Sequence, residues 1–225
     1  MMARVVHGTG DSTFDLALGG GLPHGLLLLL GEEGAGAIEF AEGLLRAAVT
    51  SHQGGRALHV SALRSCERAR AQLSEFFEDE KLAASVDYVH VPQGPLDFPA
   101  GIADWGSARV VVIETAASIA PSCPRGDVAA LGVALADLAA RSHALVVLVC
   151  GKGTLSPDAL ARLEETADGV LRFAWRHGGT MSRRTMQMVK LRGLAPILEA
   201  DEVPVFEIAL RRGEGVIVSR VTNVV

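Results

Sequence analysis

The chain of 225 residues is 49% apolar and 21% charged, a composition that supports a large buried core and excludes a mainly disordered protein. Its 21 basic and 26 acidic residues leave a net charge of −5, which excludes a strong overall attraction to nucleic acid or anionic lipid. The three cysteines lie far apart, and the longest apolar runs are too short to span a bilayer. We therefore expect a cytoplasmic protein without a metal site or a membrane contact.

Short apolar runs predict strands, and apolar residues at helical spacing predict the helices between them. Up to Asp168 we expect, in chain order, strand Leu26–Leu30, helix Ile38–Ser51, strand Ala57–Ser61, helix Cys66–Glu80, strands Val86–Val91 and Arg109–Thr115, helix Asp127–Ser142, strand Ala144–Cys150 and helix Pro157–Thr166. Beyond Asp168, glycine-bearing turns join four strands without a helix: Val170–Trp175, Thr185–Leu191, Val205–Leu210 and Val216–Val221.

This order of elements predicts an α/β fold. Strands that alternate with helices indicate a mainly parallel sheet covered on both faces, and the last four strands indicate an antiparallel C-terminal extension. Ligands of such sheets bind beyond the carboxyl ends of the strands. No linker divides the chain, so we expect one domain over residues 1–225, with a lead-in over 1–25, an α/β core over 26–168 and antiparallel strands over 169–225.

The loop after the first core strand is a candidate phosphate-binding loop. A P-loop reads G-x-x-x-x-G-K-[ST] between a strand and a helix, and Gly31 and Gly36 hold its two glycine positions. Loop amides and a helix N-terminus together form a concavity suited to an anion. The candidate nucleotide-binding residues are Gly31, Glu32, Glu33, Gly34, Ala35, Gly36, Ala37 and Ile38. The alternative is a glycine-rich turn that binds nothing.

The two side chains that give a P-loop its chemistry are absent. Ala37 stands where a lysine would reach the β- and γ-phosphates, and Ile38 stands where a hydroxyl would bind Mg²⁺. Glu39 then brings a carboxylate to the first turn of the helix, where it can interact with the helix dipole in place of a phosphate.

Motifs at both ends of the chain resemble the KaiC-like members of the RecA superfamily. The opening matches at Thr9-Gly10, Asp15, Leu18-Gly19-Gly20-Gly21-Leu22-Pro23 and Gly25, and the close matches at Ala167-Asp168-Gly169-Val170, Val189-Lys190-Leu191-Arg192-Gly193 and the last two strands. The resemblance covers nearly the whole chain and implies a RecA-like fold that binds ATP between the subunits of a ring or filament. The chain resembles the degenerate KaiC-like proteins of archaea, whose loops tend to read G-A-G-A or similar.

The resemblance also identifies two further departures in the same site. The family's paired acidic residues, which activate the attacking water, correspond to Leu63 and Arg64. The Walker B strand ends in Glu114 in place of aspartate, which keeps the charge and adds a methylene, so Glu114 remains a candidate cofactor-binding residue that can hold a metal through water. Because phosphoryl transfer relies on positioning and electrostatic stabilisation, the combined losses predict a domain without ATPase activity, and we assign no catalytic residue.

One family element is retained. In KaiC-like rings a K-x-R pair reaches from one subunit into the ATP site of its neighbour, and Lys190 and Arg192 match that pair as candidate trans-acting residues. The alternative is an outward-facing pair on a strand, because residues two apart project from the same face. The densest basic cluster (Arg172, Arg176, His177, Arg183 and Arg184) has Trp175 as its one stacking partner and favours a hairpin or a subunit contact.

From these patterns we expect a pseudo-ATPase, a non-hydrolysing KaiC/RecA-like subunit that acts by assembly with a partner or by its regulation. Its partners would be RecA- or KaiC-like subunits in a homo- or hetero-oligomer. One alternative is a KaiC-like protein that binds ATP or ADP weakly and hydrolyses it slowly or not at all; no cofactor is otherwise predicted. A second alternative is a DNA-associated, recombinase-like module, which the charge balance does not favour.

Overall fold

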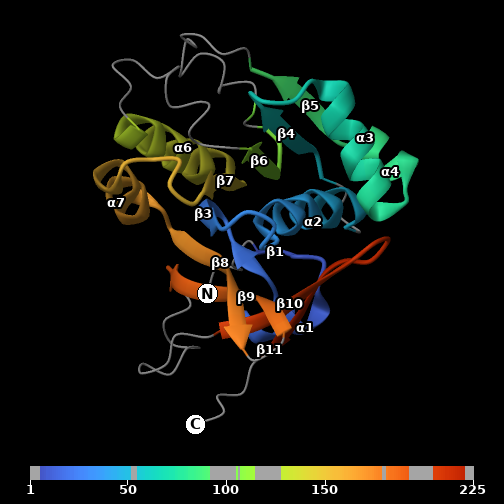
Figure 1. Cartoon of the computed structure of the whole chain (residues 1–225). Coiled ribbons are helices and arrows are strands. Elements are labelled where there is room, and N and C mark those ends of the chain that lie inside the picture. Colours follow the sequence, from blue (N-terminus) through green and yellow to red (C-terminus); the bar gives the residue numbers. More distant parts are fainter. Residues whose placement is uncertain are drawn as a thin grey trace.

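The computed structural model describes residues 6–51, 55–91, 105, 107–114, 128–178, 181–192 and 205–220 (Figure 1). The predictions made for Thr115, Asp127, Gly193 and Val221 lie outside these ranges. The described elements are β1 (Val6–His7), α1 (Ser12–Ala17), β2 (Leu22–Pro23), β3 (Gly25–Gly31), α2 (Ala37–Thr50), β4 (Ala57–Ser61), α3 (Cys66–Phe77), α4 (Glu80–Ala84), β5 (Asp87–His90), β6 (Val110–Glu114), α6 (Val128–Ser142), β7 (Leu145–Gly151), α7 (Pro157–Thr166), β8 (Gly169–Gly178), β9 (Met181–Leu191), β10 (Val205–Arg211) and β11 (Gly215–Arg220).

The main sheet has the strand order β11-β10-β9-β8-β3-β7-β6-β4-β5. The neighbouring strands β3, β7, β6, β4 and β5 pair in parallel, and β8 pairs in parallel with β3. Strands β9, β10 and β11 continue the sheet antiparallel. The predicted mainly parallel sheet with an antiparallel extension is therefore confirmed. One detail of the prediction was wrong: β8 is parallel to β3, because helix α7 precedes it and returns the chain to the same end of the sheet.

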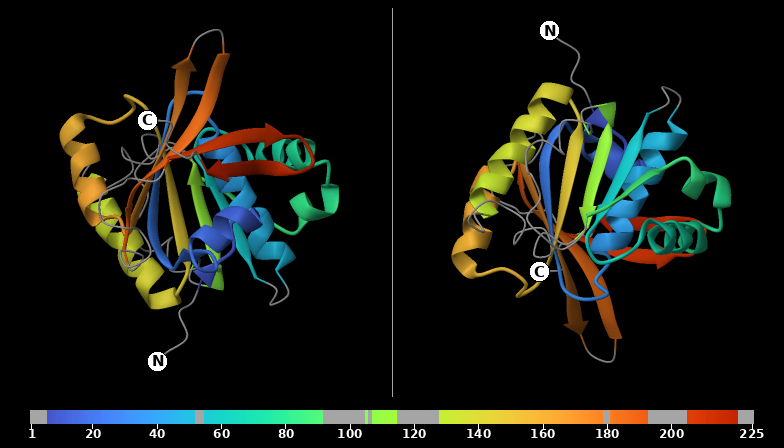
Figure 2. Two further views of the ribbon diagram at one scale, coloured as in Figure 1. Left: turned by 90° about the horizontal axis from the view of Figure 1, so that it is seen from below. Right: turned by 90° about the horizontal axis from the view of Figure 1, so that it is seen from above.

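The core lies on both faces of the sheet. Along β3, Leu27 and Leu29 belong to one buried cluster and Leu26 and Leu28 to the other, because successive side chains of a strand point to opposite faces. Helices α2 and α3 cover the first face, and α6 and α7 cover the second (Figure 2). Among the described helices, none has the length and apolar character needed to cross a membrane.

The predicted helix Cys66–Glu80 is divided into two. Helix α3 ends at Phe77, since Glu78 has a left-handed backbone with φ of 54°. The side chain of Asp79 then accepts a hydrogen bond from the Leu82 amide at 2.9 Å and starts helix α4. An N-cap aspartate of this kind favours a new helix start.

The motif at the start of the chain has a structural role. The Thr9 amide donates to Asp15 Oδ1 at 2.8 Å, which fixes the lead-in against α1. Gly25 has φ of +143°, and a Cβ at this position would lie 2.7 Å from Asp168 Oδ2. The same Oδ2 accepts a hydrogen bond from the Leu26 amide at 3.0 Å, so Asp168 links the start of β3 to the start of β8. Only glycine fits between them.

Candidate functional site

The glycine loop has the strand–loop–helix context of a P-loop. It leaves β3 at Gly31 and enters α2 at Ala37. Gly36 is the N-cap of α2 with φ of +104°, and a Cβ there would lie 2.9 Å from Ile208 Cδ1. Ala37 is buried and Ile38 packs against the core, so neither position offers a cation or a hydroxyl to a phosphate.

The carboxylate of Glu32 connects the loop to two neighbouring segments. Its Oε1 forms an ion pair with Lys152 Nζ at 2.8 Å, and Lys152 follows β7. Its Oε2 accepts a hydrogen bond from the Trp175 amide of β8 at 3.0 Å. These contacts lower the pKa of Glu32, with the Lys152 hydrogen bond as the largest cause. Glu32 is therefore ionised at neutral pH and holds the nearby lysine.

Strands β8 and β9 also hold the loop backbone. Trp175 Nε1 donates to the Glu33 carbonyl at 3.0 Å, and Arg184 Nε donates to the Gly34 carbonyl at 2.8 Å. The Arg184 guanidinium lies over the Trp175 ring, 4.4 Å from its centroid. Arg184 of the predicted basic cluster and its stacking partner Trp175 thus stabilise the loop from within the same chain.

A cavity of about 370 Å³ lies over the loop and the N-terminus of α2. Its charged lining residues are Glu32, Glu33, Glu39 and Lys152. Among the described residues, Glu33 and Glu39 form no ion pair, whereas Lys152 is paired with Glu32. The cavity therefore carries an excess of negative charge, which opposes the binding of a phosphate.

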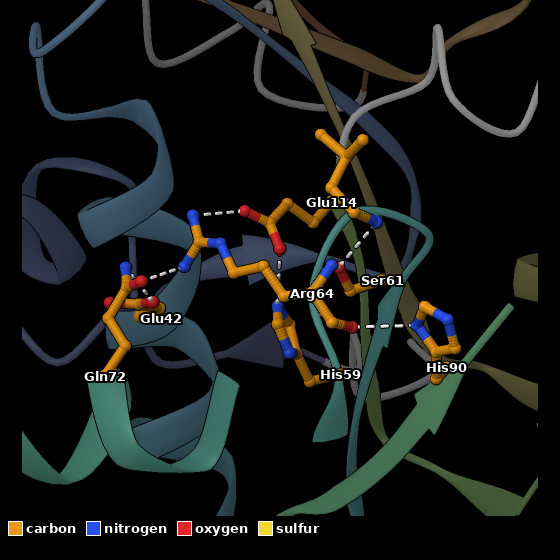
Figure 3. Close-up of polar contacts among 8 residues, drawn as sticks. Glu42, His59, Ser61, Arg64, Gln72, His90 and Glu114 are labelled. Atoms are coloured by element: carbon orange, nitrogen blue, oxygen red, sulfur yellow. Dashed lines mark hydrogen bonds and ion pairs between the residues drawn. The ribbon is translucent and has the colours of Figure 1, made fainter. Parts of the chain in front are cut away.

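Next to this loop, the ends of β4 and β6 are joined by a buried ion pair. The Arg64 guanidinium contacts Glu114 Oε1, and the Glu114 side chain is 3% exposed (Figure 3). His59 Nε2 lies 3.8 Å from Glu114 Oε2, but burial, followed by the charge of Arg64, lowers the pKa of His59 to about 4. His59 is therefore neutral at pH 7, and Arg64 supplies the charge that balances the Walker B carboxylate.

The turn after β4 fixes Arg64 in this position. Ser61 Oγ accepts hydrogen bonds from the Leu63 amide at 3.3 Å and the Arg64 amide at 3.0 Å. The Arg64 carbonyl lies 2.8 Å from His90 Nδ1 (Figure 3). Leu63, which aligns with a water-activating residue of the family, is 54% exposed, and its apolar side chain cannot accept a proton.

A second carboxylate lies on the other side of Arg64 and was not predicted. Arg64 Nη1 donates to Gln72 Oε1, and Gln72 Nε2 donates to Glu42 Oε1 at 3.2 Å (Figure 3). Glu42 is 2% exposed, and burial raises its pKa to about 8. The available signal was the position of Glu42 on the apolar face of α2, four residues after Ile38 and three before Leu45.

Lys190 and Arg192 contact the C-terminal end of α7 within the same chain. Lys190 Nζ donates to the carbonyls of Glu164 and Glu165 at 2.9 and 3.0 Å, and Arg192 Nη1 forms an ion pair with Asp168 at 3.0 Å. Cations at this end of a helix satisfy its free carbonyls and interact favourably with its dipole. To act in a neighbouring subunit, both side chains would have to leave these contacts, so the trans-acting role stays a prediction.

Comparisons with known proteins place this arrangement in context. A model of a family of unknown function (DUF7125) matches residues 6–210. No match is found among curated proteins. The chain is similar in structure to the flagellar accessory protein FlaH from Methanocaldococcus jannaschii, with 14% identity and a TM-score of 0.76 over 98% of this chain and 100% of that chain. It is also similar to the KaiC-like protein PH0186 from Pyrococcus horikoshii OT3, with 18% identity and a TM-score of 0.73 over 97% and 100%. These similarities confirm the predicted RecA-like fold of KaiC-like proteins.

Proposed function

Since the chain belongs to this family of unknown function (DUF7125) and has a KaiC-like fold, we propose that it is a non-hydrolysing KaiC/RecA-like subunit. It acts by assembling with a partner or by regulating it. The observation that carries this proposal is the buried pair of Arg64 and Glu114, which places a guanidinium on the Walker B carboxylate.

The residues of this site oppose catalysis in two ways. Phosphoryl transfer requires a metal ion near the Walker B carboxylate and a group that positions the attacking water. Here the carboxylate is neutralised by Arg64, and the apolar side chain of Leu63 has no atom that accepts a proton. The ion pair is internal and needs no nucleotide. Arg64 therefore supplies the Glu114 carboxylate with the positive charge that a metal ion would otherwise bring.

A second candidate function is weak nucleotide binding without turnover. The cavity over the glycine loop favours it, because about 370 Å³ lies beside the helix N-terminus. We expect calorimetry with ATP and Mg²⁺ to give a dissociation constant no tighter than about 0.1 mM, since Glu33 and Glu39 face the ligand and Ala37 provides no clamp. A submicromolar constant would contradict weak binding and would require Lys152 to exchange Glu32 for a phosphate.

The region best suited to a partner is the β8–β9 ribbon, residues 174–178 and 181–183. The pairing of β8 with β3 ends at Phe173, and that of β9 with β10 ends at Arg184, so the ribbon extends past its neighbours. The ribbon contains Arg176 and Arg183 and no Asp or Glu, and Arg183 is paired with Glu207 at 2.7 Å. The exposed charge of Arg176 favours an acidic protein surface as the contact.

The assembly proposal predicts a native mass above that of the monomer, unchanged by ATP and Mg²⁺. In a mixture with an intact KaiC-like protein from the same cell, the chain should change the partner's ATPase rate. The Lys190→Ala/Arg192→Ala double variant should assemble but lose this effect if the pair acts in trans. Arg211→Ala removes an exposed arginine elsewhere and serves as the control. A chain that remains monomeric both alone and in the mixture would contradict the proposal.

A further inference from the structure

A second cavity, of about 300 Å³, lies between α2, α3 and the turn that joins β10 to β11. Its lining residues are Glu39, Glu42, Gln72, Glu75, Phe76 and Arg212. It is separate from the cavity over the glycine loop, with Glu39 as the one lining residue shared by the two. Three carboxyl groups, an amide and an aromatic ring thus meet in one space large enough for a small ligand.

The buried member of this set has an unsatisfied oxygen. Glu42 is 2% exposed, and its Oε1 accepts a hydrogen bond from Gln72 Nε2 at 3.2 Å. Its Oε2 has no partner among the described residues. A buried polar atom without a partner destabilises the protein, so a donor that enters the cavity and reaches Oε2 would remove that penalty.

The cavity also lacks positive charge. Its one basic residue, Arg212, forms ion pairs with Glu78 at 3.1 Å and Glu75 at 3.9 Å, and its Nε donates to the Glu75 carbonyl at 3.2 Å. Among the described residues, Glu39 has no ion pair. The uncompensated negative charge of Glu39 therefore favours a cation as the ligand.

The residue types indicate which cation fits. No group of His, Cys, Asp and Glu among the described residues is arranged to hold a metal ion. A guanidinium is planar, presents a fork of N–H donors to carboxylates, and stacks on aromatic rings such as Phe76. We propose that this cavity binds a guanidinium group, with Glu39 and Glu42 as acceptors and Phe76 as the stacking surface. The group belongs either to a free small molecule or to an arginine side chain of a second copy of this chain.

Binding should be coupled to the release of a proton. The pKa of Glu42 is raised to about 8, chiefly by burial and also by the carboxylates Glu39 and Glu114, whereas Arg64 and Gln72 act in the opposite direction. Glu75 and Arg212 face the same cavity from α3 and the β10–β11 turn. At pH 7 Glu42 therefore holds its proton. A bound guanidinium favours the ionised carboxylate, so about one proton should leave per cation bound.

The probe is ethylguanidinium, titrated by calorimetry at pH 7 into the full chain in phosphate and in Tris, two buffers with very different ionisation enthalpies. We expect saturable binding and a difference in measured heat that corresponds to about one proton released. Glu42→Gln, which retains the shape and the contact with Gln72, should weaken binding about tenfold or more and remove the dependence on buffer. Phe76→Leu should weaken binding but leave proton release unchanged.

The matched control is Glu67→Gln, which removes an exposed carboxylate of α3 outside the cavity lining and should leave binding unchanged. Melting curves of each variant establish that it is folded. The native mass of the protein distinguishes the two sources of the guanidinium group. If an arginine of a second copy occupies the cavity, ethylguanidinium should dissociate the assembly. If the ligand is a free small molecule, the native mass should not change. The absence of saturable binding, or equal affinity and equal proton release in folded Glu42→Gln, would overturn the proposal.

Discussion

Replacing Arg64 with leucine is expected to lower the free energy of unfolding by about 3–5 kcal/mol. The substitution leaves the Glu114 carboxylate, whose side chain is 3% exposed, without a positive charge. Burial, the largest cause of the lowered pKa of His59, remains in the variant, so we do not expect this imidazole to replace the lost charge. Urea unfolding at pH 7, followed by circular dichroism, measures the loss.

The control is the double variant Arg64→Leu/Glu114→Leu, which removes both charges. Replacing a buried ion pair by apolar residues of similar volume is often neutral, so the double variant should regain most of the stability that the single variant loses. If Arg64→Leu lowers the free energy of unfolding by less than about 1 kcal/mol, the expectation is contradicted. Such a small loss would indicate that the Glu114 carboxylate is in contact with water.

Restoring the missing P-loop side chains is expected to have the second-largest effect. The double variant Ala37→Lys/Ile38→Thr should bind ATP with Mg²⁺ about 10–100-fold more tightly than the parent chain. A charge-assisted hydrogen bond to a phosphate contributes about 1.5–3 kcal/mol, and the loop already has the glycine at Gly36 that a P-loop requires. Calorimetry on both chains gives the ratio of the dissociation constants.

Thr154→Lys is the matched control for charge alone. Thr154 lines the same cavity and is exposed, so its replacement adds a lysine at a position outside the clamp. It should improve affinity less than the double variant. If both variants gain equally, the gain comes from net charge, and the glycine loop has no phosphate-binding geometry of its own.

The sequence predicted the parts of the site that depend on local order. Gly31 and Gly36 lie in a strand–loop–helix, and Ala37 and Ile38 follow directly in the chain, so their positions could be read without a structure. It also identified Arg64 and Glu114 as departures, but not as a pair. Their contact depends on β4 and β6 being neighbours in the sheet, which spacing along the chain does not specify.

Two other contacts could not be predicted for similar reasons. The sequence offers Lys190 only as a strand residue, whereas its contact with the end of α7 depends on how the helix packs beside β9. Glu42 has the expected helical position, but its burial depends on α3, whose Gln72 covers it. Contacts between elements distant in sequence are set by tertiary packing, which local sequence patterns specify only weakly.

The central claim, that Arg64 and Leu63 have replaced the catalytic machinery, is tested most directly by the rate of ATP hydrolysis. The purified chain is assayed with ATP and Mg²⁺ beside a buffer blank and the variant Glu114→Gln, which keeps the shape of the Walker B side chain without its charge. We predict that the chain and the variant release phosphate no faster than the blank. Turnover by the chain that survives further purification and disappears in Glu114→Gln would contradict the account.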